Sequence, residues 1–216
     1  MTPAKETPRK DRPLATEPET ASRRDLILAS AANLFGERGF DGVNVHAIGA
    51  AAGVTGPAIY RHFANKGAVL VALYQRLAET LTAELEDLDR EARSPHSVLN
   101  ALVRFQVTLA LQERSFIRVY LQEEGNLPSE ERHEARRSQR NYTERWVKVL
   151  AQIQPDVPVE VLRTLVHAAI GLIISIGYYD SELPKPVLED VLARAALNVL
   201  LFPTPAADLG EMSAER

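Results

Sequence analysis

The 216-residue sequence contains no cysteine, which excludes a disulfide framework, a thiolate metal site and a cysteine nucleophile. It also lacks a long apolar run. The longest uninterrupted one extends from Ala168 to Gly177, far short of the roughly 18 residues needed to cross a bilayer. The N-terminal residues are polar, charged and rich in proline, unlike the apolar core of a signal peptide. We therefore expect a soluble, cytoplasmic protein without membrane contacts.

The common catalytic motifs are absent as well. The sequence has no G-x-S-x-G elbow, no H-E-x-x-H pair and no phosphate-cradling glycine loop. Its five histidines are scattered without the spacing of metal ligands: His46, His62, His96, His133 and His167. The sequence thus predicts no enzyme, no catalytic residues, no metal site and no cofactor.

Basic residues are not in excess over the whole chain, whose net charge is −4. Their distribution is uneven. Residues 1–76 carry ten Lys/Arg and seven Asp/Glu, whereas residues 77–216 carry fifteen and twenty-two. Because nucleic-acid binding needs a local basic face and not a basic protein, the N-terminal third remains a candidate for DNA binding.

The pattern beyond the first residues is helical, since no alternating β-branched run predicts a strand and no 20–50-residue repeat is present. We expect an all-α fold with a disordered arm at 1–21, a helix-turn-helix domain at 22–68, a ligand-binding and dimerisation domain at 69–202, and a frayed tail at 203–216. The arm's basic residues can reach DNA, but we favour a solvated tail. The expected helices are 22–38, 45–52, 55–62, 65–92, 97–113, 115–124, 129–152, 158–179 and 186–202.

The segment Asn44–Lys66, NVHAIGAAAGVTGPAIYRHFANK, has the build of a helix-turn-helix. Two short helices meet at Gly53, where a tight turn favours a residue that tolerates positive φ. Ile48 and Ala52 are expected to face inward from the first helix and Ile59 and Phe63 from the second, with Val54 between them. The second helix of such a motif enters the major groove.

Polar side chains are expected on the outer side of this motif. The Thr55 hydroxyl and the backbone N–H groups beside it suit a phosphate, and Arg61 suits a bidentate contact to guanine. The remaining candidates for phosphate or base contacts are Asn44, Tyr60, His62 and Lys66. The alternative is an ordinary helical hairpin that buries Tyr60 and Phe63.

From Arg23 to Leu73 the sequence resembles the TetR family of bacterial repressors. The resemblance rests on LFGERGFDG, the AxxAGVT turn, YRHF, and the following Lys66 and Leu70. It implies a homodimer on a near-palindromic operator in double-stranded DNA, an inducer-binding C-terminal domain, and DNA contacts from Asn44, Thr55, Tyr60, Arg61, His62 and Lys66.

The recognition segment departs from the usual family pattern at three positions. Gly56 stands where a basic residue is common, Ala58 where a polar one is common, and Pro57 where a glycine is common. We therefore expect a backbone contact at Gly56 and an apolar contact from Ala58 to a thymine methyl group. The variant GPAIYRHF is similar to a branch of actinobacterial regulators of lipid and acyl-CoA catabolism.

The last two predicted helices suit a dimer interface. The segment 158–179 is apolar nearly all round in its second half, and 186–202 adds a second apolar stripe. Two such helices from each subunit can form a four-helix bundle, with a monomer core as the alternative.

An apolar ligand pocket between the C-terminal helices is a further hypothesis, with ordinary core packing as its alternative. Residues 132–148 hold many arginines, which form either a solvated, ion-paired face or a site for the phosphates of a coenzyme A thioester. The acyl group would then lie against Trp146 and Phe116. The candidate ligand residues are Phe105, Phe116, Tyr120, Arg137, Tyr142, Trp146 and His167.

These patterns favour a repressor that binds an operator as a dimer and is released by a small apolar or acyl-CoA-like inducer. The alternative is a DNA-binding dimer without an inducer, acting architecturally or through a protein partner. Activation in place of repression is open too, since sequence indicates binding and not operator position.

Overall fold

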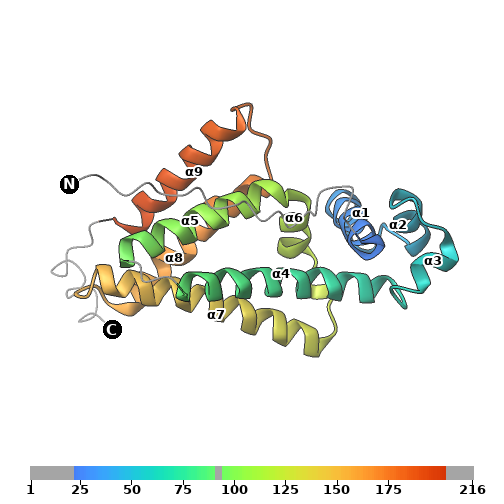
Figure 1. Cartoon of the computed structure of the whole chain (residues 1–216), viewed down its shortest axis with the longest axis horizontal. Helices are drawn as coiled ribbons and strands as arrows, with labels where there is room; N and C mark the ends of the chain where they lie inside the picture. The colour runs from blue at the N-terminus through green and yellow to red at the C-terminus, as the bar shows by residue number, and fades with distance from the viewer. Residues whose placement is uncertain (1–21, 91–93, 203–216) are drawn as a thin grey trace, which may run out of the picture.

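The computed structural model describes residues 22–90 and 94–202, and every regular element in these ranges is helical, as predicted (Figure 1). The predicted arm, the predicted tail and the predicted helix end at Ala92 lie outside the described residues. The helices are α1 Arg23–Arg38, α2 Val45–Ala51, α3 Gly56–Tyr60, α4 Lys66–Asp89, α5 Pro95–Gln112, α6 Arg114–Gln122, η1 Glu124–Asn126, α7 Ser129–Ile153, α8 Val159–Ile174, η2 Ser175–Gly177 and α9 Lys185–Leu200.

Side-chain caps begin several of these helices where the sequence predicts them. The Ser22 hydroxyl accepts a hydrogen bond from the Asp25 N–H at 3.2 Å, and the Asp25 carboxylate accepts one from the Ser22 N–H. The Asn44 and Asn65 side-chain oxygens each accept a bond of 2.8 Å from the N–H three residues later. Thr55 holds the N-cap position of α3, but its side chain makes no capping hydrogen bond. Local capping thus fixes the starts of α1, α2 and α4.

Several predicted boundaries differ from the structure, among them those of α3, α5 and α8. α3 ends at Tyr60, so Arg61 and His62 lie in the following turn. α5 starts at Pro95 with Ser94 as its cap, because a proline suits the first helical turn. α8 was expected to continue to Tyr179, but it ends at Ile174 and is followed by η2. Arginines of α6 bind the carbonyl oxygens at that end, and these interactions favour the early termination.

The turn between α2 and α3 has the predicted backbone conformation. Gly53 has a φ of 66°, and Gly39, which follows α1, has a φ of 71°. A side chain at either position would strain the backbone, although a Cβ at Gly53 would meet no atom within 4 Å. The angle between α2 and α3 therefore depends on backbone conformation and not on lack of space.

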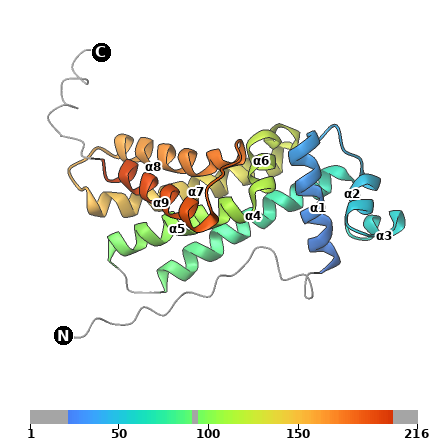
Figure 2. The ribbon, with the colours of Figure 1, turned by 90° about the horizontal axis from the view of Figure 1, so that it is seen from above.

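The N-terminal unit and the larger helical body share α4. Ile48, Ile59 and Phe63 are buried in the N-terminal unit as predicted, while Ala52 and Val54 are half-buried. From this unit α4 continues into the body, where it packs on α7 (Figures 1 and 2). Trp146, in the C-terminal half of α7, is fully buried. One continuous helix thus connects the two parts of the protein.

The segment Val159–Gly177 of α8 and η2 is long and apolar enough, by length and composition, to cross a membrane. The sequence prediction did not include this segment, because it considered only uninterrupted apolar runs and the segment contains the charged residues Glu160 and Arg163. α8 packs against α7 and α9, and Arg163 pairs with Glu144 of α7 at 2.8 Å. These contacts assign α8 to the helical body.

Candidate nucleic-acid interface and ligand pocket

α2 and α3 form the end of the molecule farthest from α9 (Figures 1 and 2). Tyr60, on α3, is 50% exposed, which excludes the alternative that it belongs to a core. Its ring lies 6.2 Å from the ring of His46 on α2, in an edge-on arrangement. The two helices therefore present one continuous outer surface, which carries both aromatic side chains.

The polar candidates at this end are exposed and largely free to bind. Arg61 and His62 make no side-chain hydrogen bond or ion pair with any described residue. The Thr55 hydroxyl, unused as a cap, is also exposed. Asn44 uses its side-chain oxygen to cap α2, which leaves its amide N–H groups as donors. These side chains can supply donors to phosphates or base edges.

Lys66 lies differently from the other candidates. Its Nζ donates a hydrogen bond of 2.7 Å to the Phe40 carbonyl and lies 4.1 Å from the centroid of the Phe40 ring. The ammonium is therefore engaged within the protein, between α4 and the α1–α2 connection. A phosphate contact would have to use its remaining donors.

The proposed role of Ala58 is wrong. Its side chain is only 4% exposed, because α3 turns Ala58 and Ile59 together toward the core. A methyl group in that position does not reach a thymine. Gly56 opens α3 directly before Pro57, which is exposed, and its backbone contact stays a prediction.

Sequence reasoning missed two residues of this unit. His46 is exposed beside Tyr60, a position that the scattered spacing of the histidines does not reveal. Arg24, in the first turn of α1, places its guanidinium 4.5 Å from the centroid of the Phe63 ring. The contact between Arg24 and Phe63 depends on tertiary packing, so the sequence alone does not predict it. The only sequence feature that pointed to Arg24 is the excess of basic residues in the N-terminal third.

A pocket of about 320 Å³ lies between α4 and α7. Two of the predicted ligand residues, Arg137 and Tyr142, line it. The full lining is Ala78, Leu81, Thr82, Leu85, Glu134, Arg137, Ser138, Asn141 and Tyr142. It therefore combines apolar side chains of α4 with polar side chains of α7.

The other five ligand candidates lie elsewhere, so the seven do not line one pocket in this structure. Phe116 and Trp146 are buried, Phe105 and Tyr120 are partly buried against the core, and His167 is exposed on α8. Helical spacing alone does not separate pocket positions from core positions, which is why the prediction included both.

The inner wall of the pocket contains an unsatisfied polar atom. Tyr142 is 4% exposed, and its hydroxyl has no hydrogen-bond partner of good geometry among the described residues. The indole N–H of Trp146, one turn away and outside the lining, is also without a partner among them. Burial raises the pKa of Tyr142 well above its ordinary value, while the nearby indole N–H lowers it by less. The phenol is therefore protonated at neutral pH and available as a donor. A buried hydroxyl without a partner is unusual, and an acceptor group that entered the pocket could pair with it.

Two family models match the chain, and together they cover more than half of it. Residues 27–73 match the bacterial regulatory proteins of the tetR family, and residues 92–176 match a tetracyclin repressor-like C-terminal domain. The chain belongs to the TetR family. It is therefore a DNA-binding transcriptional repressor of the helix-turn-helix type, and not an enzyme.

Several relatives within the TetR family are similar over much of their length. The HTH-type transcriptional repressor KstR2 of Mycobacterium tuberculosis is 28% identical over 149 residues, which cover 65% of this chain and 74% of KstR2. The solved structure of that protein, described as a ketosteroid transcriptional regulator, superposes with a TM-score of 0.71 at 24% identity, covering 84% and 94% of the two chains.

A second solved structure, AibR in complex with isovaleryl coenzyme A and operator DNA, superposes with a TM-score of 0.67 at 22% identity. The match covers 85% of this chain and all of that one. At these identities the structural likeness shows the TetR fold alone. Together the comparisons identify a TetR-family transcription regulator with distant similarity to KstR2.

Proposed function

We propose that this repressor is a cytoplasmic homodimer that binds a near-palindromic operator and is released by a small-molecule effector. The observation that carries the DNA-binding half is the exposed surface of α2, α3 and the following turn. There Arg61 and His62 have no described protein partner, and Tyr60 packs beside His46. Such side chains at the outer end of a helix-turn-helix are suited to the major groove.

The apolar surface of α8, α9 and their connection supports the dimer. Exposed large apolar side chains concentrate here, and small residues of α8, Ala168 and Gly171, are exposed as well. A Cβ at Gly171 would meet nothing within 4 Å, which leaves room for a partner helix. A large exposed apolar patch of this kind indicates a protein interface. Its large members are Val159, Tyr178, Tyr179, Leu183, Val187, Val191, Leu201 and Phe202.

The α4–α7 pocket supports an effector that is part apolar and part anionic. Arg137 is exposed at the pocket and has no described ion-pair partner, whereas Arg136 beside it pairs with Glu124. Leu81 and Leu85 provide apolar contacts, and the Tyr142 hydroxyl is available as a donor inside. An acyl-CoA thioester, including one with a steroid-derived acyl group, meets these requirements because its phosphates suit a guanidinium. Two similar proteins support this choice: KstR2 is described as a ketosteroid transcriptional regulator, and AibR is described in complex with isovaleryl coenzyme A.

The DNA-binding half is tested with an operator selected by the wild-type protein from a random duplex pool. Arg61→Ala should weaken binding to this operator by about 1–3 kcal/mol and binding to random duplex by less. Arg140→Ala, which removes an exposed arginine of α7, is the matched control and should bind both as the wild type does. An equal loss on operator and random duplex would assign Arg61 to phosphate contact and not to base readout.

The effector half is tested by calorimetry with a panel of acyl-CoA thioesters and the corresponding free acids. A ligand of the pocket should bind the wild type, release the selected operator, and bind Arg137→Ala and Tyr142→Phe more weakly. Arg136→Ala is the control for general loss of positive charge on α7. Failure of the whole panel with operator binding intact would favour the alternative of a DNA-binding dimer without this type of inducer.

A further inference from the structure

α6, a helix of nine residues, contacts both the DNA-binding unit and the end of α8. It packs along α1 on one side and against η2 on the other, and α1 belongs to the unit that carries α2 and α3 (Figure 2). The α8–α9 connection that follows η2 carries Tyr178, Tyr179 and Leu183, which belong to the proposed dimer surface. α6 is thus in contact with the DNA-binding unit and with the element that leads into this surface.

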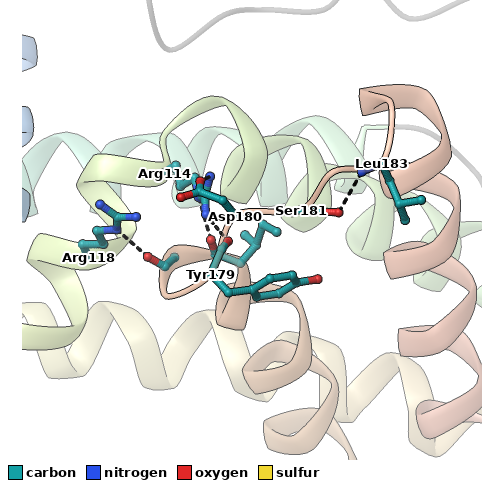
Figure 3. Close-up of polar contacts among 8 residues, drawn as sticks. Arg114, Arg118, Tyr179, Asp180, Ser181 and Leu183 are labelled. Carbon is teal, nitrogen blue, oxygen red and sulfur yellow. Dashed lines mark hydrogen bonds and ion pairs between the residues drawn. The ribbon is translucent and has the colours of Figure 1, made fainter.

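Two arginines of α6 bind the backbone where α8 ends. Arg114 Nε donates to the Ile176 carbonyl at 2.6 Å, and its other nitrogens donate to the Tyr179 carbonyl and pair with Asp180 (Figure 3). Arg118 Nε donates to the Gly177 carbonyl. Carbonyl groups at a helix end have no partner within the helix, and a planar guanidinium with several donors can satisfy more than one of them.

The residue after α6 binds the DNA-binding unit. Glu123 is 6% exposed, and its Oε1 accepts the Phe40 N–H at 3.0 Å while its Oε2 accepts the Asn126 side-chain N–H at 2.7 Å. Phe40 lies in the connection between α1 and α2, and its carbonyl accepts the bond from Lys66 at the start of α4. The backbone N–H of Phe40 is therefore bound by Glu123 of the helical body, and its carbonyl is bound by Lys66 of α4.

Close packing leaves α6 little freedom between these two attachments. A Cβ at Gly36 of α1 would lie 3.0 Å from the Ser115 carbonyl oxygen, and a Cβ at Gly177 would lie 3.2 Å from Ile117 Cγ2. Glycine at both positions allows α6 to approach α1 and η2 closely. Displacement of one neighbour would therefore be transmitted to the other through packed atoms.

We propose that α6 fixes the position of each DNA-binding unit relative to the dimer surface, with Arg114 and Glu123 as the positioning residues. In a dimer, that position determines the separation of the two recognition helices and hence the preferred spacing of the operator half-sites. This inference rests on the dimeric operator binding proposed above. Neither residue needs to touch DNA, so their loss should change the spacing preference and leave base readout within one half-site unchanged.

The test measures binding to the selected operator and to versions with the central spacer lengthened or shortened by one or two base pairs. Arg114→Lys keeps the charge but loses the planar guanidinium, and Glu123→Ala removes the acceptor. Glu123→Gln keeps an acceptor oxygen for the Phe40 N–H. Arg163→Ala, which breaks the α8–α7 ion pair with Glu144 and leaves α6 intact, is the matched control.

The wild type, Glu123→Gln and Arg163→Ala should prefer the native spacing by about tenfold or more, a difference comparable to one mismatched base pair. Arg114→Lys and Glu123→Ala should lose most of that preference while staying dimeric and binding an isolated half-site as the wild type does. Folded, dimeric variants of both residues with the wild-type preference would overturn the inference alone. A monomeric wild type, or one without a spacing preference, would overturn the dimeric operator proposal itself. Because Arg114 is partly exposed, its variant keeps the test decisive if Glu123→Ala does not fold.

Discussion

The Lys66 ammonium nitrogen lies 4.1 Å from the centroid of the Phe40 ring and donates a 2.7 Å hydrogen bond to the carbonyl of the same residue. The first residue of α4 is thereby attached to the connection between α1 and α2. The Phe40 ring in turn packs at 5.3 Å from the ring of Phe35 in the core of the N-terminal unit. Lys66 is therefore part of the structure that supports the helix-turn-helix, whether or not it also contacts a phosphate.

Lys66→Met separates these two roles. The variant loses a hydrogen bond from a charged donor and a cation–π contact, so its free energy of unfolding in urea should fall by about 1–2 kcal/mol. If Lys66 acts only through Phe40, the slope of log affinity against log salt concentration stays as in the wild type. A slope smaller by about 0.9 would instead show that Lys66 neutralises a phosphate.

Gly53→Ala should destabilise the protein by about 1 kcal/mol, because alanine adopts the positive φ of this position at a cost. Space is not the limit, since a Cβ at Gly53 meets no atom within 4 Å. Gly53→Asn is the matched control, because asparagine tolerates this conformation and should cost less. Thermal denaturation of the three proteins checks the order. A loss as large for asparagine as for alanine would mean that the turn is limited by something other than φ.

Tyr142→Phe should leave the ligand-free protein equally stable or more stable, because it removes a buried hydroxyl without a partner and keeps the ring. The ring contributes an edge-on contact to Trp146 at 6.0 Å, so Tyr142→Ala should be strongly destabilising by comparison. Thermal denaturation without ligand measures both. A clear destabilisation of Tyr142→Phe would show that the hydroxyl is already satisfied in solution, most simply by water.

Glu113, which precedes α6, should make stability depend on pH. Burial raises the pKa of its carboxyl, and the charge of Arg76 opposes this by less. The folded state thus disfavours the ionised form. The contribution of protonated Glu113 to the free energy of unfolding is therefore fully present below the ordinary glutamate pKa and is lost as pH rises through the raised pKa. Glu113→Gln should therefore gain stability relative to the wild type as pH rises above the ordinary glutamate pKa. Glu182→Gln, at an exposed carboxylate, should show no such trend in urea unfolding.

Local rules predicted the parts of the fold that depend on near neighbours in the sequence. Ser22, Asn44 and Asn65 cap helices through bonds to the residue three positions later, and Gly53 has the positive φ that its turn required. The four-residue spacing of apolar residues placed Ile59 and Phe63 inside. Each of these outcomes follows from a few consecutive residues.

Outcomes that depend on distant partners could not be predicted in this way. The end of α8 is determined together with Arg114, which is 62 residues away from the Ile176 carbonyl that it binds. Ala58 resembled a recognition-helix reader, but the packing of α3 buries it. The candidate ligand residues do not line one pocket for the same reason. Trp146 and His167 both lie in helical segments with apolar neighbours, yet Trp146 is buried and His167 is exposed.

The length of α4 has a mechanical consequence. Its 24 residues form a rod of about 36 Å that starts beside the DNA-binding unit and passes the α4–α7 pocket. A tilt of about 5° around its far end would move its first residue by about 3 Å, close to the rise of one base pair. A small tilt of α4 at the pocket would therefore shift the DNA-binding end of this helix by about the rise of one base pair.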